Sequence, residues 1–223
     1  MIKKLKFRTD QGSNLFMCSD LHLGHDRDFI YKPRGFGNVE DCKNWIIDSI
    51  NERVGKNDVL FSLGDFALNS TPEDVEYYLQ MINCENIYYV WGNHEGPTLS
   101  LYKKWVTQLS GLEDVEIYPF KYKNVTFVGR SVEVSINKKD ISLSHFAPLI
   151  WNKSHYGTYA IFGHSHGSLE HGLPSYKNGL RLDVGVEVCR EYNGSAVMSW
   201  DEIQAVMNTK HKEVIDHHNE NTN

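Results

Sequence analysis

The sequence contains no uninterrupted apolar run of about 18 residues, which is the length that a membrane-spanning helix needs. Its basic start, Met1 to Lys6, is followed by the polar residues Arg8 to Asn14 instead of the apolar core of a signal peptide. The four cysteines lie far apart and form no C-x-x-C pair, so a disulfide framework is not indicated. We therefore expect a protein of the reducing cytoplasm that has no membrane association.

The sequence also lacks any block rich in lysine and arginine, and its formal net charge is −6 at pH 7. A protein that grips long nucleic acid through the phosphate backbone needs a basic surface, so this function is open but not favoured. Hydrophobic residues make up 40% of the 223 residues, which is enough for the core of one domain. We expect that domain to span residues 1–208, followed by a polar, disordered tail at 209–223.

The first half of the sequence alternates apolar runs with amphipathic segments. The runs at 14–19, 58–63 and 86–91 are typical of buried strands. Apolar spacing predicts helices over 39–54 and about 98–109, and the Ser-Thr-Pro-Glu segment at 70–73 is typical of the start of another helix. This alternation predicts a parallel sheet with flanking helices, and ligands of such sheets collect beyond the carboxyl ends of the strands.

The second half is richer in short β-prone runs. The tetrapeptide Asn137-Lys138-Lys139-Asp140 is typical of a hairpin turn, and 201–208 of a terminal helix. Together the runs predict a second, partly antiparallel sheet packed on the first, and thus an α/β fold of two mixed sheets flanked by helices. We expect its strands at 115–118, 125–128, 132–136, 141–144, 159–162, 180–184 and 196–199.

Five short motifs at the ends of these runs carry side chains that bind metal ions. Asp, His and Asn are ligands for hard-to-borderline divalent cations. In Asp20-x-His22 and His164-x-His166, residues two apart point to the same side if the backbone is extended, so each pair can face one cluster. The glycine that begins three of the motifs allows its loop to approach the metals closely. The motifs are Asp20-Leu21-His22, Gly64-Asp65, Gly92-Asn93-His94-Glu95, Ser144-His145 and Gly163-His164-Ser165-His166.

In this order the motifs resemble those of the calcineurin-like metallophosphoesterase superfamily, and the resemblance covers roughly residues 14–200. The fold of that family is a β-sandwich flanked by helices, so the resemblance implies a four-layer α/β/β/α arrangement. It also implies two divalent cations side by side, bridged by Asp65. One ion would be held by Asp20, His22 and His166, and the other by Asn93, His145 and His164.

The resemblance further implies metal-assisted hydrolysis of a phosphate ester. A hydroxide that bridges two ions about 3.5–4 Å apart would attack phosphorus, and Asp65 would belong to the catalytic centre. His94 would be the catalytic histidine that is not a ligand, and it would polarise the phosphate or protonate the leaving oxygen. Mn²⁺ is our first choice of metal, and the mixed oxygen and nitrogen ligands also suit Fe, Zn²⁺, Ni²⁺ or Co²⁺.

The substrate-binding residues are less well defined than the metal ligands. His25 follows the first motif and could reach the substrate phosphate. In the loop 26–38, Arg34 suits phosphate recognition and aromatic residues could stack on a base; an ordered surface loop with its own apolar cluster is the alternative. Trp151 follows His145 closely and could form a wall of the pocket or pack in the core.

Three functions are compatible with the motifs. The first is a phosphoesterase that acts on a small phosphate ester, such as a nucleotide or cyclic nucleotide. The second is a nuclease that acts on DNA or RNA ends, which predicts a basic stripe beside the site. The third is an inactive metal-binding scaffold, which predicts lost ligands, whereas none is lost here. The sequence leaves open the physiological substrate, the preference for monoesters or diesters, the native metal and the oligomeric state.

Overall fold

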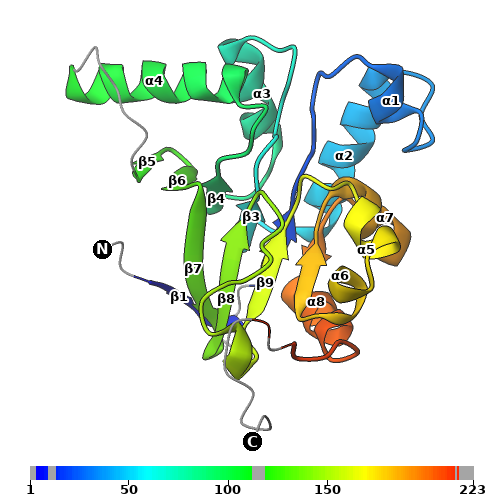
Figure 1. The fold of residues 1–223 in the computed structure, drawn as a ribbon. Coiled ribbons are helices and arrows are strands. Elements are labelled where there is room, and N and C mark those ends of the chain that lie inside the picture. The colour runs from blue at the N-terminus through cyan, green and yellow to red at the C-terminus, as the bar shows by residue number, and fades with distance from the viewer. Residues whose placement is uncertain (1–3, 10–13, 112–118, 214, 216–223) are drawn as a thin grey trace, which may run out of the picture.

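Apolar strands followed by amphipathic helices build the first half of the chain in the computed structural model, which describes residues 4–9, 14–111, 119–213 and 215 (Figure 1). The strands pair in parallel, and they are β2 (Leu15–Cys18), β3 (Val59–Ser62) and β4 (Ile87–Val90). The helices of this half are α1 (Asp28–Tyr31), α2 (Val39–Arg53), α3 (Pro72–Met81) and α4 (Gly96–Ser110). The predicted strands, their parallel pairing and the three longer helices are confirmed.

Both halves of the chain contribute to a six-stranded sheet with the order β11-β2-β3-β4-β6-β5. The strands predicted at 125–128 and 196–199 were expected in the second sheet, but they extend this first sheet by pairing with β4 and β2. Its outer strands β11 (Met198–Ser199) and β5 (Phe120–Tyr122) run antiparallel to their neighbours, whereas β6 (Val125–Gly129) is parallel to β4. A five-stranded sheet has the order β1-β7-β8-β9-β10, and β7 and β8 are its antiparallel pair. Its strands are β1 (Leu5–Phe7), β7 (Ser131–Ile136), β8 (Lys139–Ser144), β9 (Tyr159–Phe162) and β10 (Arg181–Asp183).

The turn between β7 and β8 has the backbone of a two-residue hairpin. Asn137 and Lys138 have φ values of 49° and 69°, and two successive left-handed residues match the twist of the flanking strands. The hairpin predicted at 137–140 is therefore confirmed. The strand predicted at 115–118 lies outside the described residues.

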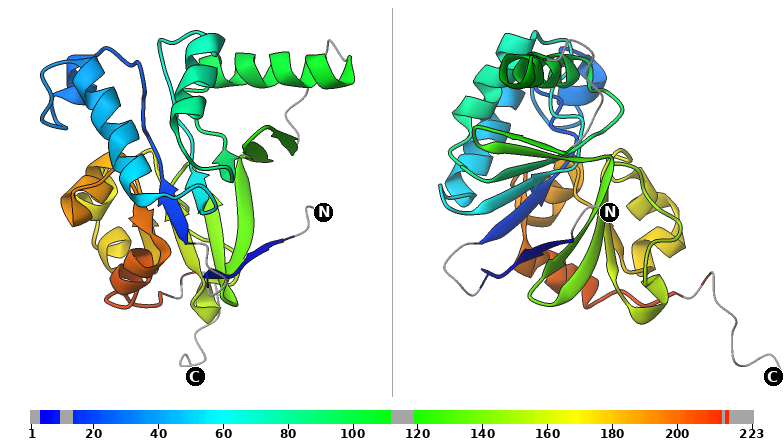
Figure 2. Two further views of the ribbon diagram at one scale, coloured as in Figure 1. Left: turned by 180° about the vertical axis from the view of Figure 1, so that it is seen from behind. Right: turned by 90° about the vertical axis from the view of Figure 1, so that its left-hand side faces the viewer.

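Alternation along the strands divides the apolar core into two parts. Leu15 and Met17 of β2 face the five-stranded sheet, whereas Phe16 and Cys18 face the helices on the other side. The part that contains Leu15 and Met17 fills the space between the sheets, and the part that contains Phe16 and Cys18 lies under α2, α3 and α4. The sheets thus form the inner two layers and helices the outer two, as predicted (Figure 2).

Short helices beside β10 were not predicted from the sequence. The chain after β9 forms α5 (Ser168–Gly172), α6 (Pro174–Asn178) and α7 (Val186–Asn193), and a 3-10 helix η2 (Ser154–Tyr156) precedes β9. None of these is long enough to give a clear apolar period in the sequence. The terminal helix is confirmed as α8 (Trp200–Met207), which packs against β2, β10 and β11.

The carboxyl ends of the two sheets meet. Ser19, directly after β2, forms an isolated parallel bridge with Gly185, two residues after β10. The Ser19 N–H donates to the Val184 carbonyl at 2.9 Å. Because β2, β3, β4, β8, β9 and β10 all run in one direction through this junction, the loops that follow them gather at one place.

The first residues of the predicted tail pack against the domain. Lys210 Nζ donates to the Glu170 carboxylate at 2.9 Å and to the backbone carbonyls of Tyr176 and Arg181. Arg181 also forms an ion pair with Glu213. The boundary predicted at residue 208 is therefore too early for 209–213, because composition does not reveal that these charged side chains have buried partners. Residues 214 and 216–223 are not among those described.

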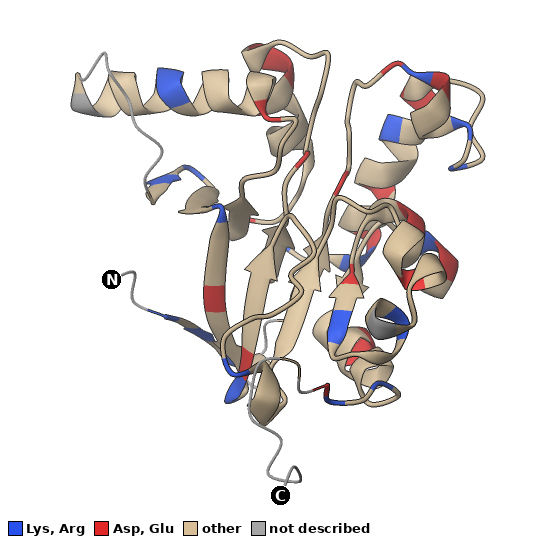
Figure 3. Cartoon of the chain, viewed as in Figure 1, with Lys and Arg blue, Asp and Glu red and all other residues tan. Residues whose placement is uncertain are grey.

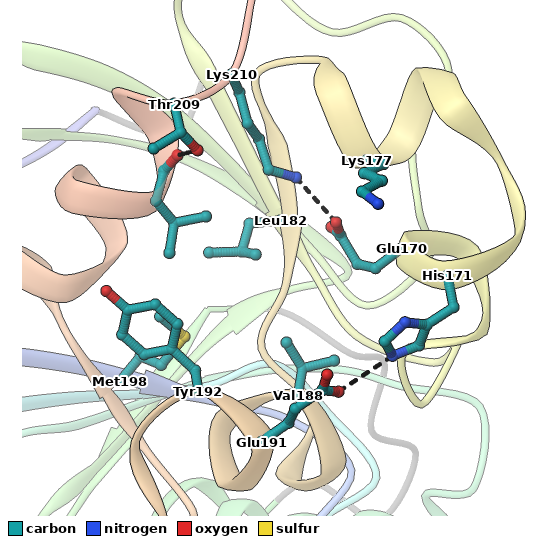
Figure 4. A pocket seen from close by; sticks show the side chains of 11 residues that line it. Glu170, His171, Lys177, Leu182, Val188, Glu191, Tyr192, Met198, Thr209 and Lys210 are labelled. Carbon is teal, nitrogen blue, oxygen red and sulfur yellow. Dashed lines mark hydrogen bonds and ion pairs between the residues drawn. The ribbon is translucent and has the colours of Figure 1, made fainter.

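The Glu170–Lys210 pair lines a cavity of about 530 Å³ beside β10 (Figure 4). Leu182, Val188 and Met198 provide apolar parts of its wall. Its lining residues include none of the predicted metal ligands or catalytic residues. The cavity is therefore separate from the place where the loops of the two sheets gather.

Two further observations concern membrane-spanning helices and cysteines. Within the described ranges, no helix is both long enough and apolar enough to span a bilayer. All four cysteines are buried and none forms a disulfide.

We predict that Lys210→Met destabilises the protein by about 3 kcal/mol, because it leaves the Glu170 carboxylate buried without its cation. The side chains of this pair are only 5% and 13% exposed. A chain of this size should then lose roughly 5–10 °C in the midpoint of thermal unfolding. Lys104→Met is the control, since it breaks an exposed pair with Glu73 and should change the midpoint little. Equal midpoints for the two variants would contradict the prediction.

Candidate metal centre

The five motifs converge at the junction of the two sheets. Each lies in the loop directly after a strand: β2, β3, β4, β8 and β9. The backbone keeps pairing beyond the strands, since Asp20 N–H donates to the Gly64 carbonyl at 3.1 Å and His22 N–H to the Asp65 carbonyl at 3.0 Å. Motifs that are far apart in the sequence are thus fixed relative to one another before any ion is considered.

The Asp65 carboxylate lies at the middle of the cluster and is 2% exposed. Its Oδ1 accepts hydrogen bonds from the backbone N–H groups of Asn93 at 2.9 Å and His94 at 2.8 Å. Its Oδ2 faces Nε2 of His145 at 3.5 Å and Nε2 of His22 at 3.8 Å. One oxygen therefore holds a motif loop, and the other points at imidazoles from two different loops.

The Asp20 carboxylate is divided in the same way. Its Oδ2 accepts from the His164 N–H at 2.8 Å, whereas its buried Oδ1 has no hydrogen-bond partner among the described residues and lies 3.9 Å from Nε2 of His166. Both ring nitrogens of the buried His22 also lack a partner. Buried polar atoms without partners are costly, and these converge, so they fit a divalent cation. Asp20, His22 and His166 can reach one ion together.

A second group of ligand atoms lies beside the first. Asp20, Asp65 and His145 could share an ion, and Asn93 Oδ1 lies 2.7 Å from His145 Nε2. The His145 Nδ1 is 2.8 Å from the Leu63 carbonyl, which accepts its proton in the neutral ring. The Nε2 lone pair then faces the Asn93 oxygen, so both atoms could serve as ligands of one cation, as at metal-bound histidines.

The structure brings His164 and His94 close without including them in these groups. The His164 ring is 5.2 Å from that of His145, and the exposed His94 ring is 5.9 Å from that of His22. Therefore two assignments remain predictions: His164 as a ligand and His94 as the catalytic residue.

Burial without a cation perturbs several of these groups. It raises the pKa of Asp20 to about 7, because the buried carboxylate loses hydration. Burial also lowers the pKa of His22 to about 2. At His166, burial lowers the pKa, but the hydrogen bond and the charge of Glu187 outweigh burial and raise it. An electropositive ion in the centre would favour the anionic carboxylate and the neutral His22 imidazole.

Most of the predicted ligands have a strained backbone. The left-handed φ values lie between 48° and 67°, a region that non-glycine residues rarely adopt. An extended backbone was expected from the sequence in Asp20-x-His22 and His164-x-His166, and this expectation is wrong. In each motif, the residues on both sides of the intervening residue are left-handed. Such strain clusters at functional sites because the surroundings enforce it. The residues are Asp20, His22, Asp65, His164 and His166.

Three motif glycines allow the loops to approach one another. A Cβ on Gly64 would lie 2.6 Å from the Gly92 backbone, and one on Gly92 would lie 2.8 Å from the Asp65 nitrogen and overlap its Oδ1. A Cβ on Gly163 would lie 2.6 Å from Asp20 Oδ2. From the sequence, these glycines were predicted to let the loops approach the metals. In the structure, the missing side chains let the loops approach the Asp20 and Asp65 carboxylates and one another.

Acidic residues outside the five motifs hold the ligands, and sequence reasoning missed two of them. Glu187 Oε1 lies 3.0 Å from His166 Nδ1, and its pKa falls to about 2 because the hydrogen bond from His166 and the charge of Arg34 outweigh the effect of burial. Asp183 accepts from Ser165 Oγ and from the N–H groups of Gly167 and Gly185. No local motif marks either residue, since both act across long sequence separations.

Glu95 has a structural role in the centre. Its carboxylate accepts from the N–H groups of Asp65 at 2.9 Å and Gly92 at 2.7 Å, and from the Tyr89 hydroxyl at 2.6 Å. It thereby joins the loops after β3 and β4.

Arg34 was predicted to bind the substrate phosphate, but it lies buried behind the first motif. Its nitrogens donate to Glu187 at 2.8 Å and to the backbone carbonyls of Leu21 and Asp20 at 2.9 and 2.7 Å, and its side chain is fully buried. The guanidinium suits an anion, as expected, but the anion is a protein carboxylate. Arg34 therefore positions the first motif instead of facing a substrate.

The other two predicted substrate residues differ from each other. His25 is buried beside His22, with 5.4 Å between the rings, and its Nδ1 has no partner. Trp151 donates its indole N–H to Thr158 and lies over the Arg181 guanidinium at 5.4 Å, which corresponds to the packing alternative.

Comparison with known proteins agrees with this geometry. The family model described as calcineurin-like phosphoesterase matches residues 14–197. The chain therefore belongs to the calcineurin-like phosphoesterase family. The family and the candidate ligand groups make it a metal-dependent phosphoesterase, a hydrolase that acts on phosphoesters.

Individual relatives add information on the fold alone. An uncharacterised protein of Methanocaldococcus jannaschii is 30% identical over 82 residues, which are 36% of this chain and 46% of that protein. The match thus spans less than half the length of this relative. The crystal structure of a protein of unknown function from Aquifex aeolicus has a TM-score of 0.59 and 19% identity, and the match covers 87% of this chain and 100% of the other.

We predict that Gly92→Ala loses metal binding, because the new methyl group displaces the Asp65 carboxylate. The affinity for Mn²⁺, measured by titration calorimetry, should fall at least about tenfold. Gly96→Ala is the matched control, since a Cβ there meets nothing within 4 Å. If Gly92→Ala bound Mn²⁺ as tightly as this control, the loop contact would not matter for the centre.

We also predict that Glu187→Gln weakens Mn²⁺ binding by about 10- to 100-fold, because the neutral amide no longer orients and polarises His166. Glu191→Gln on the same helix breaks an exposed pair with His171 and should leave the affinity unchanged. The same loss in both variants would indicate a general charge effect instead.

Proposed function

We propose that the protein is a dinuclear metal-dependent hydrolase of small phosphate esters. The observation that supports it best is that two adjacent groups of ligand atoms share the Asp20 carboxylate, with Asp65 in the second group. Two adjacent cations repel each other, so a site for them needs anionic oxygens between them. Asp65, with imidazoles of two loops facing one oxygen, suits the bridging role.

The residues divide between the ions as follows in our proposal. Asp20, His22 and His166 would hold one ion, Asn93, His145 and His164 would hold the other, and Asp65 would contribute to both. When bound, the ions supply a nucleophilic water at neutral pH and neutralise the phosphoryl oxygens as charge builds. Mn²⁺ is the proposed metal, because carboxylate, amide and imidazole ligands suit it, and availability decides between it and Fe, Zn²⁺, Ni²⁺ or Co²⁺.

His94 is the proposed proton donor to the leaving oxygen. Its backbone N–H is held by Asp65 at 2.8 Å, so the residue is anchored, while its side chain is exposed next to His22. An anchored, exposed imidazole can reach a substrate oxygen without binding an ion itself. His25 is the proposed second contact to the phosphate, because its Nδ1 is unpaired in the described structure.

The two rival functions have less support. A nuclease needs basic side chains along its substrate, but Lys4, Lys6, Arg8 and Lys138 line a groove around β1 and the start of β8. Figure 3 shows the distribution of basic and acidic residues along the chain. His145 follows the other end of β8, roughly 20 Å away for a strand of this length. An inactive scaffold is expected to lack ligands, yet all seven predicted ligands are present.

We predict that His94→Ala lowers kcat by about 10²- to 10⁴-fold while both ions stay bound, because a proton donor is lost and no ligand is. The assay is hydrolysis of diphenyl phosphate and phenyl phosphate with Mn²⁺, because their phenolate leaving groups are basic enough to need a proton, and metal content is measured by mass spectrometry. His171→Ala, at an exposed histidine of α5, is the control.

Each outcome of this assay has a distinct meaning. Loss of activity on chelation and its return with Mn²⁺ supports metal dependence, and the ratio of the two substrates gives the monoester or diester preference. Unchanged turnover in His94→Ala would refute the proton-donor role, and loss of an ion in that variant would make His94 a ligand. No hydrolysis by a sample that holds two ions would favour the scaffold.

A further inference from the structure

Two exposed phenyl rings stand at opposite ends of a row of imidazoles in the metal centre. At one end, Phe29 of α1 lies edge-on to His25 with 5.7 Å between ring centroids, and His25 is 5.4 Å from His22. At the other end, Phe146 lies 4.6 Å from His164. Both phenyl rings therefore contact histidines of the centre.

The exposure of these rings is unusual for large apolar side chains. Phe29 is 69% exposed and Phe146 is 52% exposed, and Leu149 and Ile150 continue the apolar strip at 56% and 46%. Single exposed apolar residues are common, but a group of them beside a polar site is typical of a binding surface. Neither phenylalanine belongs to the clusters that form the core.

Phe146 is also held in position. Its ring packs edge-on against His145 at 5.2 Å, and its backbone carbonyl accepts from the Ser144 hydroxyl at 2.9 Å. A fixed aromatic ring has little conformational entropy to lose when a ligand covers it. The free surface of Phe146 is thus prepared to contact a flat, apolar group.

We infer that Phe146 binds a flat aromatic group of the substrate, such as a nucleobase, beside the scissile phosphate, and that Phe29 contacts the substrate from the opposite end of the row. The inference rests on the proposed phosphoesterase function. A phosphate held at the ions would lie beside these imidazoles, so the group attached to it would come within reach of Phe146, which contacts His164. Aromatic stacking does not depend on which base is present, and it covers apolar surface that water otherwise hydrates. A sugar phosphate without a base would leave the Phe146 ring in water.

The test compares substrates that share the same scissile bond. Adenosine 5′-monophosphate and ribose 5-phosphate differ in the base alone, and the 5′-methyl esters of both serve as the diester pair. For the wild type with Mn²⁺, we expect kcat/KM to be at least about tenfold higher with the base. Phe146→Ala should lower this ratio by about 5- to 100-fold, mainly through KM, and Phe29→Ala should lower it less.

Matched variants separate stacking from other effects. Phe146→Trp keeps an aromatic ring and should retain the ratio, whereas Phe146→Leu keeps apolar surface without a ring and should lose it. Leu109→Ala removes a side chain that is 62% exposed at the far end of α4 and should change nothing. Thermal unfolding should be the same for all these variants, because each position is more than half exposed.

The outcomes distinguish this inference from the function on which it rests. If the wild type hydrolyses neither pair, the proposed function fails and the inference falls with it. If it hydrolyses both members of a pair equally, or if Phe29→Ala and Phe146→Ala leave the ratio unchanged, the inference alone is overturned. A ratio retained in Phe146→Leu would also overturn it, because apolar contact and not stacking would then account for the preference.

Discussion

Two buried carboxylates, those of Asp20 and Asp65, determine how the rest of the site is built. Each uses one oxygen to accept backbone N–H groups from another motif loop, and turns the other oxygen toward imidazoles. Burying two anions side by side is unfavourable unless opposite charge or hydrogen bonds compensate. The strained backbone, the motif glycines and the supporting Glu95 and Asp183 all follow from the need to hold these anions together.

Much of this arrangement could be predicted from the sequence, because the signals are local. Apolar runs gave the strands, and the residues right after them gave the motifs, whose convergence follows from the direction of parallel strands. The backbone conformation that brings the motif side chains together was predicted less well. Asp20 and His22 reach the same cluster through left-handed conformations, and a spacing of two residues cannot distinguish these from an extended backbone.

The residues that support the ligands could not be predicted in the same way. Arg34 has the chemistry of a phosphate-binding residue, and only the tertiary structure reveals that Glu187, 153 residues away, is its partner. That glutamate then holds His166, so one guanidinium links the first motif to the last. The tail was misjudged for a related reason, since Lys210 is polar in the sequence but finds a buried carboxylate in the fold.

The centre also joins the two ends of the domain. The hydrogen bond from His164 to Asp20 connects residues 144 positions apart, and an ion shared by Asp20 and His166 would close a loop of similar length. The ligands assemble only when both sheets have formed, so the ions bind the native chain and not the unfolded one. Binding to the native state alone stabilises it by mass action. The fraction of folded protein would therefore rise with the free metal concentration, so the ion would act as part of the fold as well as of the site.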